Sequence, residues 1–382
     1  MKAVSEGTMR ITDGFVDEMY FCLDCQACET VCPAGVQYGV LVEAARTQIA
    51  RSGSDPWKLR LLRNIVLRGI LSSQSRLRSS STLGRFLQTI GLFRLLSVFP
   101  MVPTSVREFT RWLPPIPSGL FSDSAAEVHR PWGAARYRVG FLSGCVMNVL
   151  HQDVHRDSVD VLLKNGCEVF IPKKQLCCGS LLAHYGDIDA AQRLARANVE
   201  AFTEGSVDAI VVNSAGCSAF MKEYGSLLQN DALYAERAAL LASKTRDIVE
   251  FLTEIGFTKP TGRLQSRVTY HDACHHIHSQ QISRQPRDIL RSIPGVQLVE
   301  LEESSWCCGS AGMYNLLRYE DSTKMLERKM ENIRQRGADV VCTGNPGCLL
   351  QLQLGSRKFG VPVEPLHVVT LLRRSYGRGT SA

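Results

Sequence analysis

Short apolar stretches alternate with longer amphipathic ones over the C-terminal two thirds of the chain. Six of the short stretches are rich in β-branched residues and predict strands, at 138–142, 168–171, 208–212, 267–270, 296–299 and 339–341. Between them apolar residues recur at helical spacing, most clearly over 149–164 and 314–335. Because strands that alternate with helices form parallel sheets, the pattern predicts an α/β fold with mostly parallel sheets.

A different pattern fills residues 51–115. Leucine, isoleucine and phenylalanine recur there at roughly helical intervals, with arginines between them, which predicts two or three amphipathic helices. Prolines between 100 and 117 then predict a linker. Eleven Lys and Arg residues stand against two acidic ones, Asp55 and Glu108. Two interpretations stay open: helices that pack between domains with arginine in solvent, or a docking surface for an anionic membrane or a partner subunit.

Composition places the chain among ordinary globular proteins. Its 382 residues suffice for two or three domains, and 45% apolar and 21% charged residues are typical values. No apolar run of about 18 residues occurs, and the acidic N-terminal stretch does not resemble a secretory signal, so we expect a cytoplasmic protein. Residues 51–115 account for the net charge of +7, and the near-neutral remainder argues against nucleic-acid binding.

The 14 cysteines are the unusual feature of the composition. They stand in tight groups that include two adjacent pairs, Cys177-Cys178 and Cys307-Cys308, and adjacent cysteines rarely form a disulfide with each other. A chain of this size also needs no disulfides in order to fold. Clustered cysteines in a reducing compartment are typical of ligands for metals or iron–sulfur clusters.

The first group follows the spacing of a bacterial ferredoxin: Cys22, Cys25, Cys28 and Cys32, with Pro33 after the last. This spacing suits a [4Fe-4S] cluster, although four cysteines could also hold zinc. In two-cluster ferredoxins the fourth cysteine of each run ligates the other cluster, yet residues 1–21 contain no cysteine. Either the fourth ligand is rearranged around a lone cluster, or a partner run is missing.

The remaining sequence contains a duplication of about 130 residues. Corresponding cysteines are offset by 129, 130, 130 and 131 positions. The first set is Cys145, Cys177, Cys178 and Cys217, and the second is Cys274, Cys307, Cys308 and Cys348. Each group follows a predicted strand, so all four cysteines of a repeat are expected at the carboxyl edge of a parallel sheet. Iron–sulfur ligation is the favoured interpretation, and zinc is the alternative.

A Cys-Cys-Gly unit lies at the centre of each repeat. Glycine would permit the tight backbone that lets adjacent cysteines face one site. We expect Ser180 and Ser310 to cap helices whose N-termini favour thiolates.

Other cysteines and histidines carry weaker signals. Cys167 and Cys342 fall outside the repeated positions, in or beside predicted strands, and are expected to be buried apolar residues. Histidines near the cysteines could hydrogen-bond cluster sulfurs or relay protons, or could be ordinary polar loop residues: His184, His271, His275, His276 and His278. We find no Gly-rich nucleotide motif, serine-centred triad or paired-carboxylate site.

These motifs resemble the Cys-Cys-Gly (CCG) domain family, which includes heterodisulfide reductase B-type subunits and iron–sulfur subunits of flavin dehydrogenases. The chain most resembles glycolate oxidase (glycolate dehydrogenase) iron–sulfur subunits, over essentially its whole length. The resemblance is carried by the run from Cys22 to Gly39, by Tyr270-His-Asp-Ala-Cys-His275, by Cys307-Cys-Gly-Ser-Ala-Gly-Met-Tyr-Asn315 and by Thr343-Gly-Asn-Pro-Gly-Cys348.

The chain departs from the family pattern in two ways. The family generally has two ferredoxin runs, and only the second is matched, so we expect that the sequence is N-terminally truncated. Heterodisulfide reductase-type domains end in Cys-x2-Cys and supply five thiolates to each site. Ser214 and Asn345 occupy the first of those positions here, which puts a five-thiolate cluster in doubt.

The resemblance implies an electron-transfer subunit of a flavin-dependent glycolate (2-hydroxy acid) dehydrogenase. A partner FAD-containing oxidase subunit would oxidise the substrate, and [4Fe-4S] clusters here would pass electrons toward membrane quinone, with no flavin or nicotinamide in this chain. A peripheral position on the cytoplasmic face of the inner membrane would follow. Alternatives are disulfide reduction at a CCG cluster, or a role as the iron–sulfur subunit of a lactate or glycerol-3-phosphate dehydrogenase.

Four segments are expected. Residues 1–50 form a small helical ferredoxin-type segment, 51–135 a basic helical linker, 136–258 the first CCG domain and 259–382 the second.

Overall fold

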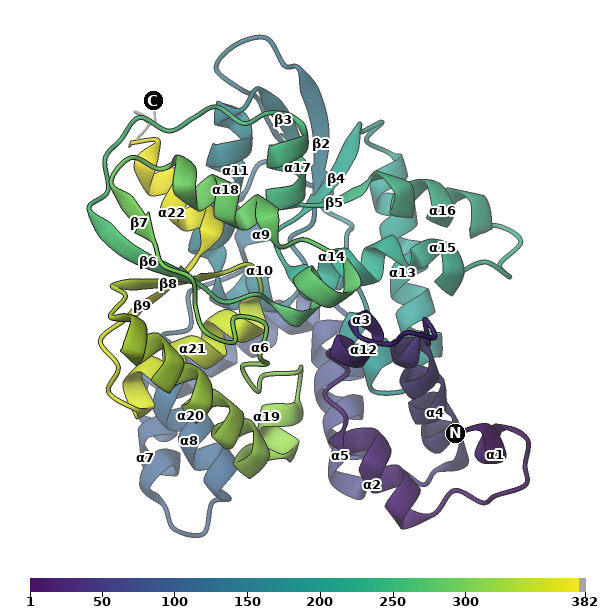
Figure 1. Ribbon diagram of the computed structural model, residues 1–382. Helices are drawn as coiled ribbons and strands as arrows, with labels where there is room; N and C mark the ends of the chain where they lie inside the picture. Colours follow the sequence, from purple (N-terminus) through teal and green to yellow (C-terminus); the bar gives the residue numbers. More distant parts are fainter. Residues whose placement is uncertain (378–382) are drawn as a thin grey trace.

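Two parallel sheets, each covered by helices, form the body of the protein in the computed structural model, which describes residues 1–377 (Figure 1). The strand order in the first sheet is β1-β3-β2-β4-β5. Its strands are β1 (Val128–His129), β2 (Tyr137–Phe141), β3 (Cys167–Phe170), β4 (Ala209–Val212) and β5 (Thr245–Asp247). Only the edge strand β1 is antiparallel to its neighbour. This strand comes from the segment before residue 136.

The second sheet repeats the arrangement of the first. Its order is β7-β6-β8-β9, and all its strands are parallel: β6 (Ser266–Tyr270), β7 (Val296–Leu298), β8 (Val340–Thr343) and β9 (Glu364–His367). One backbone contact is duplicated as well. The Arg138 N–H donates to Asp208 Oδ2, and the Arg267 N–H donates to Asp339 Oδ2, at 2.8 Å in both cases. The predicted fold class, two tandem repeats with mostly parallel sheets, is confirmed.

All six predicted strands are present, within two residues of their predicted ends. Three further strands were missed, β1, β5 and β9, because they are only two to four residues long and lack an alternating pattern. Each of the two long predicted helices is in fact a pair. The first divides at His151 into α10 (Val146–Leu150) and α11 (Gln152–Lys164), and the second divides at Arg318 into α19 (Tyr314–Leu317) and α20 (Tyr319–Arg336).

The other helices of the repeats connect strands or cover the sheets. In the first repeat they are α12 (Ser180–His184), α13 (Ile188–Thr203), α14 (Ala215–Lys222), α15 (Tyr224–Leu227), α16 (Ala235–Lys244) and α17 (Ile248–Glu254). In the second they are a π-helical turn (His275–Ser279), α18 (Arg284–Ser292), α21 (Pro346–Lys358) and α22 (Val368–Ser375).

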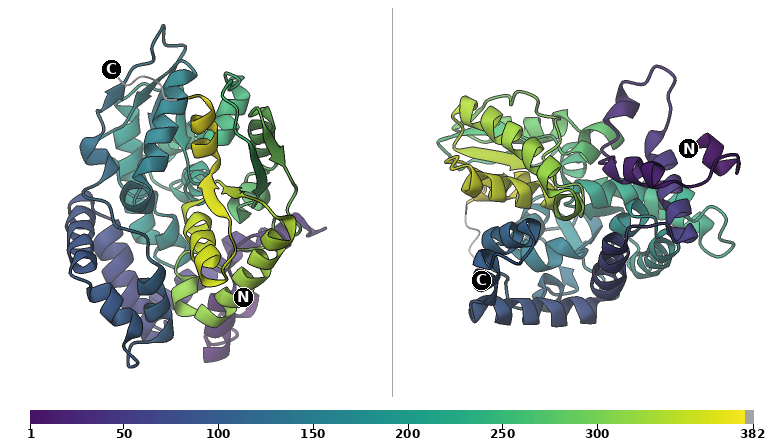
Figure 2. Two further views of the ribbon diagram at one scale, coloured as in Figure 1. Left: turned by 90° about the vertical axis from the view of Figure 1, so that its left-hand side faces the viewer. Right: turned by 90° about the horizontal axis from the view of Figure 1, so that it is seen from below.

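Residues 1–124 are helical and curve beneath the two repeats (Figure 2, right). The first helices are α1 (Lys2–Ser5), α2 (Asp13–Phe21), α3 (Ala27–Thr30) and α4 (Tyr38–Ser52). Then come α5 (Trp57–Leu62), a π-helical segment (Arg63–Leu71), α6 (Gln74–Thr89), α7 (Leu92–Val98), α8 (Thr104–Trp112) and α9 (Phe121–Ser124). The two or three helices predicted for residues 51–115 were thus too few. The proline-rich linker was wrong over α8, which starts directly after Pro103. No helix within residues 1–377 is long and apolar enough to cross a membrane.

The two repeats share one hydrophobic core. Val139 and Phe141 of β2 belong to the same buried cluster as Val268 and Tyr270 of β6. The C-terminal helix α22 of the second repeat packs against α11 of the first. A backbone hydrogen bond also joins the repeats beside the cysteines: the Ala215 N–H donates to Gly344 O at 3.0 Å. The repeats therefore form one packed body.

A buried ion pair fixes the N-terminal helices to the first repeat. Arg63 Nη2 lies 2.5 Å from Asp55 Oδ2, and the two side chains are 6% and 1% exposed. The Tyr20 hydroxyl donates to Asp55 Oδ1 at 2.7 Å, and Arg63 Nη1 donates to Tyr185 O at 2.9 Å. Asp55 thus joins α2 to the π-helical segment, and Arg63 joins that segment to the loop after α12.

Replacing this carboxylate should destabilise the protein strongly. In Asp55→Asn the buried guanidinium of Arg63 loses its anionic partner, and breaking such a pair costs about 3–5 kcal/mol. Asp189→Asn is the matched control, because its pair with Arg51 is 64% exposed on both sides and contributes at most about 1 kcal/mol. Anaerobic urea unfolding followed by circular dichroism measures both. Equal destabilisation by the two substitutions would contradict the assignment.

Candidate metal centres

The four repeated cysteines lie at the carboxyl edge of each sheet. Cys145 stands at the start of α10, and Cys274 at the start of the π-helical turn, each a few residues after a strand. Cys217 and Cys348 are each the third residue of a helix, in α14 and α21. The paired cysteines lie in the loops before α12 and α19.

In the first repeat the thiols are crowded and mostly buried. Cys145 Sγ lies 3.2 Å from Cys177 Sγ, and Cys178 hydrogen-bonds both Cys177 and Cys217. Hydrogen bonds to neighbouring thiols, with burial, raise the pKa of Cys145 and Cys178 well above the usual value. The pKa of Cys177 is lowered, because it accepts from two thiols. Four thiols this close cannot all ionise without a compensating cation, which a metal or cluster supplies.

The second repeat gathers its thiols in the same way. Cys308 hydrogen-bonds Cys307 and Cys348. The bond with Cys308, together with burial, raises the pKa of Cys307. At Cys308 the bond with Cys307 lowers the pKa, but the bond with Cys348 and burial outweigh it and raise the pKa overall. Burial also raises the pKa of Cys274, whose Sγ lies 3.5 Å from His275 Nδ1. The crowded, buried thiols of both repeats fit an iron–sulfur cluster or another thiolate-bound metal.

The glycine of each Cys-Cys-Gly unit holds the first of the two thiols in place. The Gly309 N–H donates to Cys307 Sγ at 3.3 Å, and the Gly179 N–H donates to Cys177. Both glycines have left-handed backbones, with φ of +94° at Gly179 and +84° at Gly309. A Cβ at Gly309 would lie 2.5 Å from Ser322 O, so no larger residue fits.

The predicted serine caps are wrong. Ser180 is the first residue of α12 and makes no capping bond with its side chain, and Ser310 lies four residues before α19 begins. The N-terminus of α19 therefore does not directly follow the second Cys-Cys-Gly unit. In the first repeat α12 does begin directly after the Cys-Cys-Gly unit, and in both repeats the glycine N–H donates to a thiol.

The N-terminal cysteines are divided between two environments. Cys22 and Cys25 line the cavity that the two repeats share, whereas Cys28 is exposed and Cys32 lies near the surface. Burial raises the pKa of Cys25, and neighbouring Cys307 raises it further. Backbone N–H groups of Val36 and Ala34 lower the pKa of Cys32 instead. The structure thus brings Cys25 to the second repeat's site.

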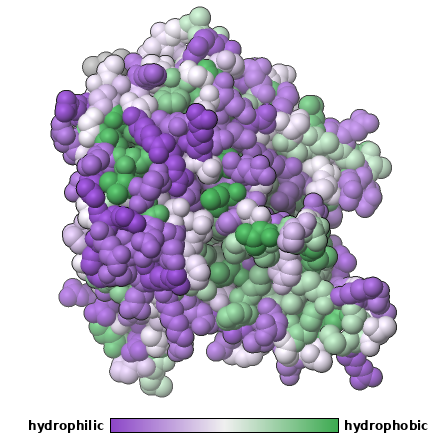
Figure 3. All heavy atoms as spheres, viewed as in Figure 1, coloured by the Kyte–Doolittle hydropathy of each residue, from purple (hydrophilic) through white to green (hydrophobic). Residues whose placement is uncertain are grey.

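One cavity of about 530 Å³ connects these groups. Ten of the twelve proposed ligands line it, all except Cys28 and Cys32. Its lining is mostly apolar, with Val16, Leu59, Trp112 and Leu317 among the lining residues. Figure 3 shows apolar residues around the hollow at the centre of this face. The cavity therefore gives access to both CCG sites and to the ferredoxin-type loop.

Arg46 and His184 join the ferredoxin-type loop to the first repeat, a link that was not predicted from the sequence. Arg46 is 3% exposed and donates to Met19 O, Cys22 O and His184 O at 2.6–2.9 Å. His184 Nδ1 lies 2.5 Å from Glu43 Oε1 and 3.1 Å from Asp24 Oδ2. Burial alone would lower the pKa of His184, but these two carboxylates raise it to about 10. Spacing along α4 could not reveal partners about 140 residues away.

The remaining candidates have varied surroundings. His276 Nε2 contacts Asp247 Oδ2 at 2.9 Å, between the repeats, and His278 contacts Thr30 at 2.8 Å. Burial lowers the pKa of His275 to about 4. Cys167 and Cys342 are completely buried in β3 and β8, as predicted, and burial raises the pKa of Cys167 to about 12.

Comparisons with known proteins agree with the duplication. The model of the CCG family, described as a cysteine-rich domain, matches residues 139–222 and 268–353. These matches contain both Cys-Cys-Gly units and define the chain as a protein with two CCG domains.

The relatives identify the family within this class. "Probable glycolate oxidase iron-sulfur subunit" of Bacillus subtilis (strain 168) is 35% identical over all of this chain and 87% of that protein. "Glycolate oxidase iron-sulfur subunit" of Escherichia coli (strain K12) is 28% identical over 94% of this chain and 83% of that protein. "Lactate utilization protein A" of Halalkalibacterium halodurans is 30% identical over 62% of this chain and 96% of that protein. The chain belongs to the glycolate oxidase iron–sulfur subunit family, and this membership supports iron–sulfur clusters as its cofactors.

Alanine substitutions at two buried cysteines of the second repeat should differ sharply in their effect on the amount of bound iron. Cys308→Ala removes a thiol that contacts two other site cysteines, so we expect loss of the iron held by the second repeat. Cys342→Ala, at an equally buried position in β8, leaves the site thiols intact and should retain the iron. Iron and acid-labile sulfide are measured per chain after anaerobic purification. Equal iron content in the two variants would contradict the assignment.

Proposed function

We propose that this chain is the electron-transfer subunit of a flavin-dependent glycolate (2-hydroxy acid) dehydrogenase, acting at the cytoplasmic face of the membrane. A partner FAD-containing subunit would oxidise the substrate, and electrons would pass through this chain toward quinone. The observation that carries the proposal is the shared cavity, which both CCG sites and the ferredoxin-type loop line together. Family membership supports the hydroxy-acid class of reaction.

The proposed ligands are the twelve cysteines of the three groups. When bound, [4Fe-4S] clusters supply one-electron transfer. The ligands are Cys22, Cys25, Cys28 and Cys32 in the N-terminal segment, Cys145, Cys177, Cys178 and Cys217 in the first repeat, and Cys274, Cys307, Cys308 and Cys348 in the second. Burial of most repeat thiols keeps water from them, and the N–H groups of Gly179 and Gly309 stabilise thiolate charge.

The proximity of Cys25 to the thiols of the second repeat supports a direct electron path. Thr30 and His278 form a second link between the ferredoxin-type loop and the loop after Cys274, at 2.8 Å. Ser279 Oγ donates to Gln26 Oε1 at 2.6 Å, which is a third. These contacts favour electron exchange between the N-terminal segment and the second CCG site.

Lactate is the second candidate substrate of the complex, because the lactate utilization protein A relatives match along nearly their whole length. Disulfide reduction is less favoured. Asn345, at the position of the fifth cysteine of heterodisulfide reductases, accepts a hydrogen bond from the Gly216 N–H at 3.2 Å and thereby joins the repeats.

Glycolate oxidation coupled to quinone reduction should require this chain. The assay combines the full chain, the candidate flavoprotein and a soluble quinone, with glycolate or lactate as the electron donor. We expect quinone reduction with the wild-type chain and loss of it with Cys308→Ala, while the flavin is still reduced by substrate. A rate unchanged by omission of the chain would refute the proposal. Quinone reduction with lactate but not with glycolate would identify lactate as the substrate of the complex.

A basic apolar face on α6, α7 and the following turn supports membrane contact. Its exposed apolar residues are Leu83, Phe86, Ile90, Leu95, Val98, Phe99 and Met101. The side chains of Arg76, Arg85 and Arg94 on the same two helices are also exposed, and no acidic residue occurs between Asp55 and Glu108. Apolar side chains beside unopposed positive charge suit an anionic lipid surface. We propose that this face docks on the membrane that holds the quinone.

Charge reversal on this face should weaken vesicle binding. For Arg85→Glu with Arg94→Glu we expect about tenfold weaker binding or more, since each basic residue near an anionic surface contributes about 1 kcal/mol. Lys174→Glu with Arg284→Glu, at exposed positions of the repeats, changes the net charge equally and should have little effect. Co-sedimentation with phosphatidylcholine vesicles, with and without phosphatidylglycerol, measures binding. Equal binding by both double variants, or no dependence on anionic lipid, would refute membrane docking by this face.

A further inference from the structure

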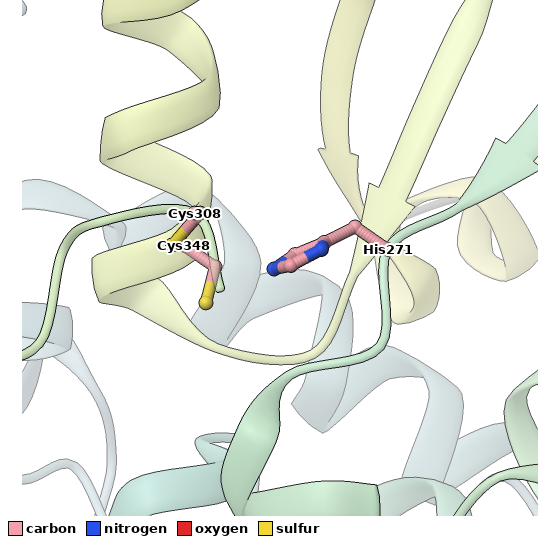
Figure 4. Close-up of side chains that lie close together, drawn as sticks. All are labelled: His271, Cys308 and Cys348. Carbon is pink, nitrogen blue, oxygen red and sulfur yellow. The ribbon is translucent and has the colours of Figure 1, made fainter. Parts of the chain in front are cut away.

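His271 is directed at two cysteines of the second CCG site. It directly follows β6, is 1% exposed, and has a ring nitrogen within 4.8 Å of the sulfurs of Cys308 and Cys348. Figure 4 shows the far end of the imidazole ring pointing at these sulfurs, which come from the Cys-Cys-Gly loop and from α21. A nitrogen donor therefore lies at a site already built from four thiols.

Hydrogen bonding defines which nitrogen is free. His271 Nδ1 lies 3.2 Å from Ser304 O, and a carbonyl can only accept, so Nδ1 carries the proton of the neutral ring. Nε2 then has a lone pair, and it is buried without a hydrogen-bond partner. A buried polar atom without a partner is costly unless something unseen binds it, such as a metal.

The carbonyl that orients His271 is itself held from several sides. Lys329, which is completely buried, donates to both Glu303 O and Ser304 O. The Asp272 N–H also donates to Ser304 O, at 3.1 Å. Arg287 in turn binds both carboxylate oxygens of Asp272, at 2.9 and 2.8 Å. Support of this kind behind a histidine is typical of a metal ligand, whose second nitrogen is fixed by a carbonyl.

The first repeat has no such donor at the equivalent position. Leu142 follows β2 as His271 follows β6, and each lies three residues before the first site cysteine. The backbone contacts correspond as well, since the Leu142 N–H donates to Val211 O and the His271 N–H donates to Cys342 O. A buried leucine cannot bind a metal, so the two CCG sites differ in their donor sets.

We propose that His271 Nε2 is a fifth ligand of the second CCG site, which thus has four thiolates and one imidazole. The proposal rests on the iron–sulfur function proposed above. A neutral imidazole adds a donor without adding negative charge, whereas a fifth thiolate would add one. Replacing thiolate by imidazole raises the reduction potential of iron–sulfur centres, so the second site should be easier to reduce than a five-thiolate one.

The test looks for nitrogen bound to iron. The full chain is purified anaerobically with natural or ¹⁵N-labelled histidine, partly reduced, and studied by pulsed EPR. We expect one cluster signal with a strongly coupled nitrogen that changes with the histidine label. The coupling should vanish in His271→Ala and persist in His278→Ala, a matched histidine of the same loop that contacts Thr30. In His271→Cys the coupling should also vanish, and the midpoint potential of that cluster should shift to a more negative value.

The outcomes separate this inference from the function on which it rests. Protein with no iron or sulfide would overturn both. Reducible clusters without a strongly coupled nitrogen, or a coupling that persists in His271→Ala, would overturn the ligand assignment and leave electron transfer intact. The comparison of labelled and unlabelled wild-type protein shows whether any histidine binds the cluster even where a variant fails to fold, and a spectrum that does not change with the label would overturn the ligand assignment.

Discussion

The structure depends on one geometric requirement, which is that cysteines far apart in sequence meet at one point. Parallel strands meet this requirement, because their carboxyl ends lie along one edge of a sheet. Cys145 and Cys217 follow adjacent strands of the first sheet, and the Cys-Cys-Gly loop brings the other two thiols to them. The second sheet repeats this solution with the same strand order. Gly179 and Gly309, with positive φ, restrict which residues the chain can accept beside the thiols.

Spacing along the sequence was enough to predict the features that are repeated. Equal offsets between the two cysteine sets predicted the duplication, and the apolar stretches before them predicted the central strands. The edge strands β5 and β9 were missed, because such short strands are stabilised by pairing with a neighbouring strand and not by a pattern in their own sequence. Ser180 and Ser310 were wrongly expected to cap helices, because a serine before a helical stretch resembles an N-cap in sequence. In the structure the neighbouring backbone N–H groups donate to the thiols.

Long-range polar contacts could not be predicted in the same way. Arg46, His184 and Asp55 obtain their partners from segments that come together only in the folded chain. A buried arginine within a predicted amphipathic helix looks like any exposed one in the sequence. His271 is intermediate, because its position beside Cys274 suggested a role. A ring nitrogen within 4.8 Å of two site sulfurs, and the Ser304 carbonyl on Nδ1, distinguish it from His275, His276 and His278.

The backbone contacts between the repeats also bear on how electrons could move. The Ala215 N–H binds Gly344 O, and the Gly216 N–H binds Asn345 Oδ1, directly beside the helices that carry Cys217 and Cys348. The separation between the two CCG sites is therefore set by main-chain geometry and by a common core. Electron exchange across this boundary would have a low reorganisation energy and a rate independent of solvent viscosity, unlike transfer by a carrier domain that must swing between partners.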